Sequence, residues 1–113
     1  MAEVTLIKQK IKEDKIEKLR GWMKDVANRE EEAVETLKDE GVFTETAFIE
    51  ETDQGAFLVT YMEVDELEQV WETFEDSDHE IDKEFKRVMN ECLENIQNTG
   101  NYDPLYHITN PKR

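Results

Sequence analysis

The sequence has only one cysteine, Cys92, among 113 residues, so it cannot form an internal disulfide. It also lacks a run of about 18 apolar residues, the length that a membrane-spanning helix needs. Its first residues include neither the basic stretch nor the apolar segment of a secretion signal. We therefore expect a single domain over residues 1–113, a cytoplasmic location and no membrane partner. Because Cys92 has apolar neighbours at helical spacing, it is expected to be a small core residue.

Positive charge is scarce, with 14 Lys and Arg against 29 Asp and Glu and a formal net charge of -15. Proteins that bind nucleic acid draw affinity from clustered Lys and Arg, so nucleic acid is excluded as a partner. The sequence has no glycine-rich phosphate loop, dinucleotide fingerprint or nucleophile elbow, and we expect no cofactor. Zinc is not expected either, since the two histidines are far apart in sequence; a carboxylate site for a hard cation stays open.

Apolar periodicity predicts the secondary structure of the N-terminal half. Residues 3–11 alternate as in a β-strand, and residues 13–40 carry a helical stripe that Gly41 ends. Two further strands, 42–51 and 56–64, are separated by a short link with the composition of a hairpin turn. This pair of strands is expected to be antiparallel.

Two helices and a strand are predicted for the remainder. Residues 65–76 and a second segment that begins at Ser77 and ends before Gly100 both open with the spacing of a capping box. A final strand is predicted at residues 105–109. The resulting fold class is α+β, a ferredoxin-like βαββαβ arrangement with an antiparallel sheet and a split second helix.

Both faces of this sheet are apolar, although helices can cover only one of them. The first set of residues is Phe43, Ala47, Ile49, Phe57, Val59 and Tyr61, and the second is Val42, Phe48, Leu58 and Met62. Burying the helix-free face against a second copy resolves the conflict, so we expect a homodimer through the sheet face.

Glu30 is the first candidate catalytic residue. On a helical wheel it lies close to the middle of the apolar stripe of residues 13–40, so it should point inward. Burial would raise the pKa of its carboxyl, as a general acid or base requires. Two alternatives stay open: a buried structural role, or a helix break near Asn28 that turns Glu30 to solvent.

His79 is the second candidate catalytic residue, with Asp78 beside it as a candidate binding residue. Its predicted place in the first helical turn after Ser77 disfavours an imidazolium, because the helix dipole is positive there. A neutral imidazole can accept a proton or polarise a carbonyl. The alternative is an ordinary packed or solvated histidine.

Four other residues are candidate binding residues. Glu45 and Tyr61 lie on the two hairpin strands, where a carboxylate and a phenol could reach a pocket. Arg29 precedes Glu30. Trp22 flanks the first helical stripe and has the alternative roles of core or dimer-interface residue.

Several short runs carry a family resemblance. They are Trp22-Met23, Arg29-Glu30, Glu40-Gly41-Val42, Tyr61-Met62-Glu63, Ser77-Asp78-His79-Glu80-Ile81-Asp82 and Glu91-Cys92. Through them the whole chain resembles an uncharacterised family, a domain of unknown function, in the dimeric α/β-barrel superfamily. Glu80 departs from the proline that often follows the histidine in that family. The resemblance implies a ferredoxin-like monomer whose sheet packs on that of a partner to form a barrel.

Two functions fit these observations. One is a cofactor-independent enzyme or binder of a small molecule, which moves protons as a mutarotase or isomerase does, with Glu30 and His79 at a common cavity. The other is a non-catalytic homodimeric module, structural or stress-related. Haem degradation is a weaker option, because neither histidine has the context of an axial ligand.

Overall fold

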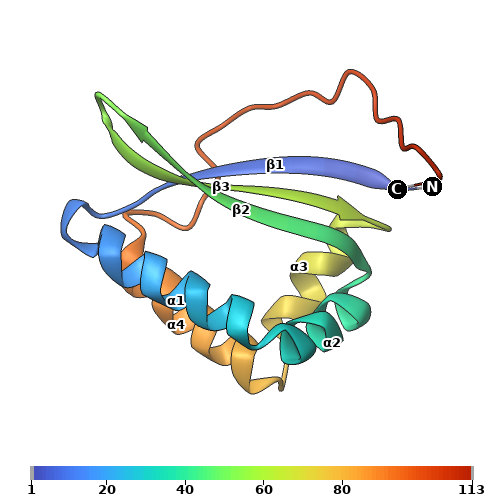
Figure 1. The fold of residues 1–113 in the computed structure, drawn as a ribbon, viewed down its shortest axis with the longest axis horizontal. Helices are drawn as coiled ribbons and strands as arrows, with labels where there is room; N and C mark the ends of the chain where they lie inside the picture. The colour runs from blue at the N-terminus through green and yellow to red at the C-terminus, as the bar shows by residue number, and fades with distance from the viewer. Residues whose placement is uncertain (1, 113) are drawn as a thin grey trace.

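The computed structural model describes residues 2–112, which form an α+β fold with one antiparallel sheet and its helices on a single face (Figure 1). The elements are β1 (Glu3–Lys10), a 3-10 helix (Glu13–Lys15), α1 (Ile16–Asn28), α2 (Glu30–Glu40), β2 (Val42–Thr52), β3 (Gly55–Val64), α3 (Leu67–Glu75) and α4 (Glu80–Cys92). The strand order is β1-β3-β2, with β3 antiparallel to both neighbours.

The predicted hairpin is confirmed, and its register divides β3 between the two faces of the sheet. Ala56, Leu58, Met62 and Val64 are buried on the side that faces the helices. The alternate residues of β3, from Phe57 to Glu63, therefore lie on the helix-free face, because successive strand residues point to opposite faces. Gly55, with φ 121°, supplies the positive φ that closes the turn.

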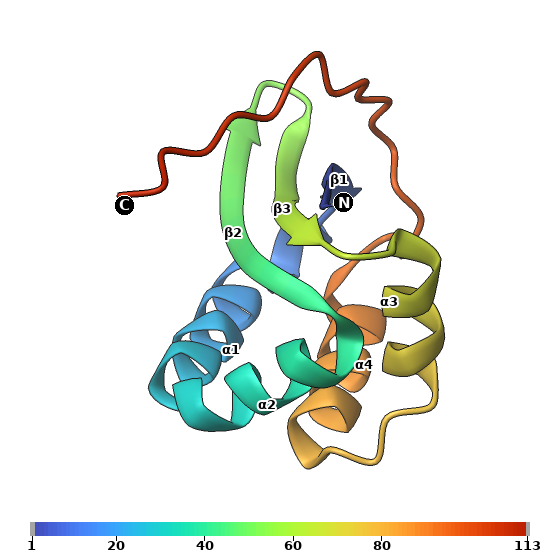
Figure 2. The ribbon, with the colours of Figure 1, turned by 90° about the vertical axis from the view of Figure 1, so that its right-hand side faces the viewer.

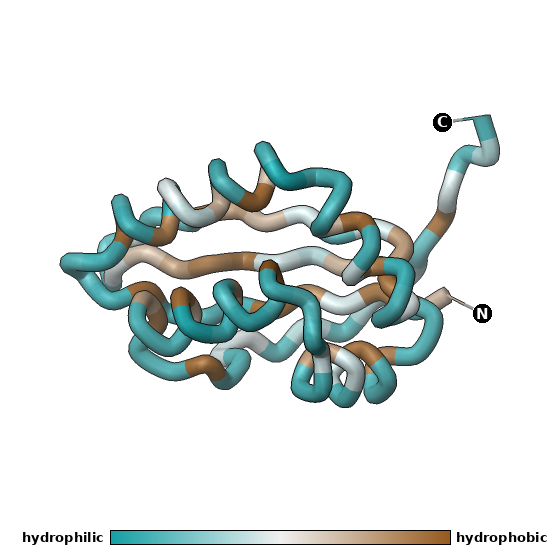
Figure 3. Tube along the Cα trace, turned by 90° about the horizontal axis from the view of Figure 1, so that it is seen from below, coloured by the Kyte–Doolittle hydropathy of each residue, from teal (hydrophilic) through white to brown (hydrophobic). Residues whose placement is uncertain are grey.

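The core lies between the sheet and the helices, where apolar side chains from all layers meet. Its larger cluster comprises Ile11, Leu19, Trp22, Ala56, Leu58, Ile81, Met89, Cys92 and Leu93. Cys92 is fully buried in it, which confirms its predicted core position. Figure 3 shows the outer surfaces of the helices as largely hydrophilic, so the apolar stripes of these amphipathic helices face the sheet.

The single helix predicted for residues 13–40 is wrong, because the chain breaks at Arg29. This residue has φ -115° and ψ 42°, and it separates α1 from α2. Three glutamates in a row, Glu30–Glu32, then occupy the first turn of α2, where the helix dipole favours negative charge. Gly41, with φ 75°, ends α2 in the left-handed conformation, as the sequence predicted.

The split into α3 and α4 is confirmed, but the predicted capping boxes do not form. The N–H of Leu67 at the start of α3 donates to a carboxylate oxygen of Glu3 at 3.3 Å, on the neighbouring strand. At α4 the N-cap residue is His79, and its side chain makes no capping hydrogen bond. Ser77 is engaged elsewhere, in the hydrogen bonds described below.

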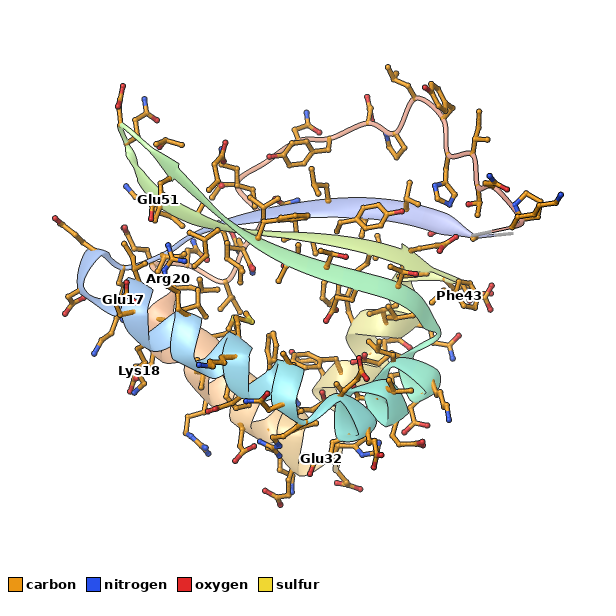
Figure 4. All side chains as sticks on the ribbon, in the orientation of Figure 1. Glu17, Lys18, Arg20, Glu32, Phe43 and Glu51 are labelled. Carbon is orange, nitrogen blue, oxygen red and sulfur yellow. The ribbon has the colours of Figure 1, made fainter. Side chains whose placement is uncertain are left out.

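An ion pair ties α1 to the hairpin end of the sheet. Arg20 on α1 places Nη2 3.0 Å from Oε1 of Glu51 on β2, and Figure 4 shows the two residues one above the other. At the opposite end of β2, Phe43 is exposed next to a register shift in the β2–β3 ladder.

The strand predicted at residues 105–109 does not form. After α4 the chain follows the outer edge of β1, where the N–H of Glu94 donates to Lys10 O and the N–H of Thr99 to Lys8 O. It then continues without regular structure on the side of the sheet opposite the helices (Figures 1 and 2). We name residues 100–112 the C-terminal segment. Its backbone forms no hydrogen-bonded ladder with the sheet, and the sheet therefore has three strands.

Candidate functional site

A cavity of about 900 Å³ lies among α2, α3, the loop that joins α3 to α4, and the start of α4. Figure 2 shows these elements together at one end of the molecule. Its lining residues are Thr36, Asp39, Glu40, Glu66, Glu68, Gln69, Glu72, Thr73, Asp76, Ser77, Asp78, His79 and Asp82. All of them are polar, eight are acidic and one, His79, is basic. We name this space the acid-lined cavity.

Glu40 is the most perturbed group of the cavity. It is the last residue of α2, and the left-handed Gly41 after it fixes where the chain leaves the helix. Glu40 is only 6% exposed, and no hydrogen bond or ion pair reaches its carboxyl group from any other residue between 2 and 112. Burial, followed by the negative charge of Asp82, raises the pKa of Glu40 from its ordinary 4.5 to about 8. Glu40 is thus poised to exchange a proton near neutral pH.

Asp82 is a second buried carboxylate, held by a short hydrogen bond. Ser77 Oγ donates to Asp82 Oδ2 at 2.6 Å and accepts the N–H of His79 at 3.1 Å. Ser77 therefore links the loop before α4 to the first turn of that helix. The bond compensates for part of the cost of burying the Asp82 carboxylate.

His79 and Asp39 form a hydrogen-bonded pair at the same cavity. His79 Nε2 lies 2.6 Å from Asp39 Oδ2, and this bond raises the pKa of His79, although partial burial acts in the opposite direction. The direction of this shift is opposite to the effect predicted from the helix dipole. The carboxylate of Asp39 outweighs the helix dipole, because a direct charged hydrogen bond is stronger than the effect of a helix end.

Two further sequence candidates are carboxylates near Asp82 and His79: Asp78 belongs to the lining of the cavity, whereas Glu45 does not. Glu45 projects from β2 on the side that faces the helices, since its partner across the ladder is the buried Met62. Burial and, second, the charge of Asp82 raise the pKa of Glu45, although its side chain keeps contact with water. Asp78 lines the acid-lined cavity beside His79.

The predicted inward orientation of Glu30 is wrong, and the alternative with a helix break describes its position. Glu30 is exposed in the first turn of α2 and does not line the acid-lined cavity. Glu30 and His79 therefore do not meet at that cavity. Because the helix restarts after Arg29, the angular relation that placed Glu30 on the α1 stripe is lost.

The other three sequence candidates also lie outside the lining. Trp22 is buried in the core, where its ring meets Phe85 edge-on at 6.0 Å, and its indole N–H has no hydrogen-bond partner within the described part of the chain. Arg29 binds Glu84 at 2.5 Å and thereby joins the α1–α2 break to α4. Tyr61 projects from the helix-free face of the sheet.

Glu40 and Asp82 are not among the residues predicted from the sequence, although both carry a signal there. Glu40 follows Ala33 and Leu37 at helical spacing, so it belongs to the apolar stripe of α2. Asp82 lies beside Ile81 within the run that begins at Ser77. A single continuous helix over residues 13–40 places Glu30, and not Glu40, at the middle of the apolar stripe.

Within residues 2–112, no three His, Cys, Asp or Glu side chains converge closely enough to hold a metal ion. None of the helices described for this chain has the length and apolar character needed to cross a membrane.

The fold and the cavity define a small α+β protein with a three-stranded antiparallel sheet and a polar, acid-lined space among its helices. A family model, described as a family of unknown function (DUF6176), matches residues 2–113, and the chain belongs to this family. Comparison with curated proteins and with solved structures gives no match. Membership agrees with the predicted resemblance to an uncharacterised family and does not extend to the dimeric α/β-barrel superfamily.

Proposed function

We propose that the protein acts on a small molecule in the acid-lined cavity by proton transfer, with Glu40 as the group that gives or takes the proton. The observation that carries this proposal is Glu40, which is nine-tenths buried, lines the cavity and has no partner for its carboxyl group among residues 2–112. A general acid or base works best when its pKa lies near the working pH, and the pKa of Glu40 is about 8.

The chemistry that suits this arrangement needs no cofactor. One of two groups, Glu40 or a neighbouring carboxylate, donates a proton to a carbonyl or ring oxygen of the substrate, and the other takes a proton from carbon or from a hydroxyl group. This exchange is the reaction class of mutarotases and isomerases. Asp82 and the His79–Asp39 pair are the neighbours that the cavity offers for the second transfer.

A ligand screen with matched variants tests the proposal. Sugars, hydroxy acids and enolisable carbonyl compounds are added to wild type, Glu40→Gln and Glu31→Gln, and the melting temperature is recorded. Glu31 is an exposed residue of α2 that does not line the acid-lined cavity, so its variant controls for the loss of one charge. We expect a compound that stabilises wild type and Glu31→Gln but not Glu40→Gln. If the compounds that bind raise the melting temperature of all three proteins equally, Glu40 is not part of the site.

Glu30 and His79, the sequence candidates, enter the same screen as Glu30→Gln and His79→Ala. Because Glu30 is exposed and outside the lining, the proposal expects Glu30→Gln to respond like wild type. His79→Ala should bind differently from wild type, since it removes from the lining the partner that holds Asp39.

A second candidate function is a non-catalytic homodimeric module, structural or stress-related, in a cytoplasmic setting. The observation that favours it is the helix-free face, where Val4, Leu6, Phe57 and Val59 are only partly covered and Phe48 is exposed. A homodimer through this face would remove these side chains from water.

The C-terminal segment adds to the same surface. Leu105, Tyr106 and Ile108 are 93%, 80% and 80% exposed, respectively, and His107 binds Glu63 of β3 at 3.0 Å on the helix-free side. The strand order and the path of residues 94–99 along β1 support the ferredoxin-like, dimeric α/β-barrel assignment, in which a fourth strand would occupy that edge. Light scattering at several concentrations tests the homodimer; a monomer at every concentration would exclude it.

A further inference from the structure

We infer that the ligand of the acid-lined cavity is an organic ammonium ion, which pairs with the carboxylate of Glu40. This inference rests on the proposed function of the same cavity and names the chemical class of its ligand.

The first argument is the lack of any partner for Glu40. A buried carboxylate that no donor reaches is costly, and proteins avoid it by pairing the charge or by keeping the group neutral. Within the described part of the chain, the lining of the cavity contributes no Lys or Arg. Its one basic side chain, His79, is already bound to Asp39. A cation that pairs with the ionised form of Glu40 would therefore come from outside the described residues of the chain.

The second argument is the sign of the whole lining. Eight carboxylates surround one space, and a cleft with walls of a single sign concentrates the electrostatic potential and attracts ions of opposite charge. Hydroxy acids and phosphorylated sugars would be repelled. Within the wider substrate class proposed above, the cavity therefore selects against anions.

The third argument separates an organic cation from a metal ion. Divalent metals need several oxygen ligands that converge on one point, whereas no three His, Cys, Asp or Glu side chains of residues 2–112 are so placed. A space of about 900 Å³ is at the upper end of the size of small-molecule sites, roughly 300 to 1,000 Å³. Since no apolar residue lines it, the ligand should carry further amino or hydroxyl groups in place of an apolar body.

Binding of such a cation should be coupled to proton release. A positive charge beside Glu40 favours its ionised form, so below pH 8 the carboxyl must lose a proton as the ligand enters. Affinity should therefore increase by up to about tenfold per pH unit from pH 6 toward pH 8.

The experiment is isothermal titration calorimetry of the full chain with putrescine and spermidine at pH 6 and pH 7.5, in two buffers of different ionisation enthalpy. The uncharged 1,4-butanediol matches the carbon chain of putrescine, and Ca²⁺ and Mg²⁺ represent metal ions. We expect stoichiometric binding of an amine, with proton release at pH 6. Glu40→Gln should weaken it by about tenfold or more, whereas Glu31→Gln should stay within about twofold of wild type.

Four outcomes would overturn the inference. If Glu40→Gln and Glu31→Gln weaken amine binding equally, the amines are attracted to the acidic surface as a whole and not to Glu40. Binding of Ca²⁺ or Mg²⁺ that depends on Glu40, without binding of the amines, would assign the cavity to a metal ion. A third outcome is that the amines do not bind, whereas an uncharged sugar or carbonyl compound binds wild type but not Glu40→Gln. That result would refute the ammonium ligand and leave the proposed function intact. If no compound of any class depends on Glu40, both proposals fail.

Discussion

Replacing Glu40 with glutamine should make the protein more stable, and more so as the pH rises. Glutamine has nearly the shape of the neutral acid, but it cannot ionise. The pKa of Glu40 is raised from 4.5 to about 8 because its charged form is buried near Asp82. Below pH 4.5 the carboxyl is protonated in both the folded and the unfolded state, so it contributes no pH dependence there.

Between pH 4.5 and pH 8 the unfolded chain releases this proton while the folded protein retains it. The unfolded state then gains stability relative to the folded state, by about 1.4 kcal/mol per pH unit for one fully buried group. Over the whole interval the penalty reaches at most about 5 kcal/mol, and above pH 8 it stays constant. Because the cavity is open to water, which screens the charge, we expect about 2 to 3 kcal/mol. That is a large part of the total stability of a small domain, roughly 5 to 15 kcal/mol.

Urea denaturation at pH values from 5 to 9 measures the effect, with wild type, Glu40→Gln and Glu31→Gln compared at each pH. His79 and Glu45 also have raised pKa values, but both residues are retained in wild type and variant. The difference between the two free energies of unfolding therefore reports on Glu40. We expect the free energy of unfolding of Glu40→Gln to increase relative to that of wild type from pH 5 to pH 8, and the difference to stay constant above pH 8. The free energy of unfolding of Glu31→Gln should follow that of wild type. A constant difference between Glu40→Gln and wild type at every pH would refute the raised pKa of Glu40.

Three more outcomes follow from the contacts of the chain. Asp39→Asn should lower the pKa of His79 toward its ordinary 6.5, because the carboxylate bond is the main cause that raises it; NMR titration of the imidazole measures this value. In the wild type, the stabilisation from this pair is complete below pH 6.5 and is lost as the pH rises through the raised pKa. Ser77→Ala should cost about 1 to 3 kcal/mol in urea denaturation, because it leaves a buried carboxylate without its donor, and a loss below about 0.5 kcal/mol would contradict that role. If the protein is a homodimer through the sheet, Phe48→Asp and Ile108→Asp should each shift its mass by light scattering toward the monomer, and unchanged masses would place the interface elsewhere.

Local patterns in the sequence were sufficient for most of the fold. The alternation of residues 3–11 and of the hairpin strands predicted β1, β2 and β3 to within one or two residues, because each strand buries one face. The stop at Gly41 and the split between α3 and α4 were also predicted correctly, since Gly and the polar run around Ser77 interrupt a helical stripe whatever the tertiary contacts are.

The failures share a physical cause, namely contacts between residues distant in sequence. Arg29 breaks the first helix where its side chain reaches Glu84, and no periodicity within residues 13–40 contains that contact. The charge of His79 depends on Asp39, 40 positions earlier in the chain. The segment 105–109 has strand-like composition but no neighbouring strand in the single chain. The same break leaves Glu30 exposed in the first turn of α2 and places Glu40 on the buried side of that helix.

Two unfavourable features remain in the single chain, and they lie on opposite sides of the sheet. On the helix side, Glu40 is buried without a partner; on the helix-free side, Leu105 and Ile108 are exposed to water. Under the two proposals a cation would relieve the first and another copy of the chain the second, so neither partner could substitute for the other. A change on one side should therefore leave the other function intact. Ile108→Asp should bind spermidine like wild type, and Glu40→Gln should keep the mass of the wild type, because a polar substitution on one face leaves the packing of the other unchanged. Loss of amine binding in Ile108→Asp would mean that the cavity is complete only in the dimer, and the two proposals would then describe one site.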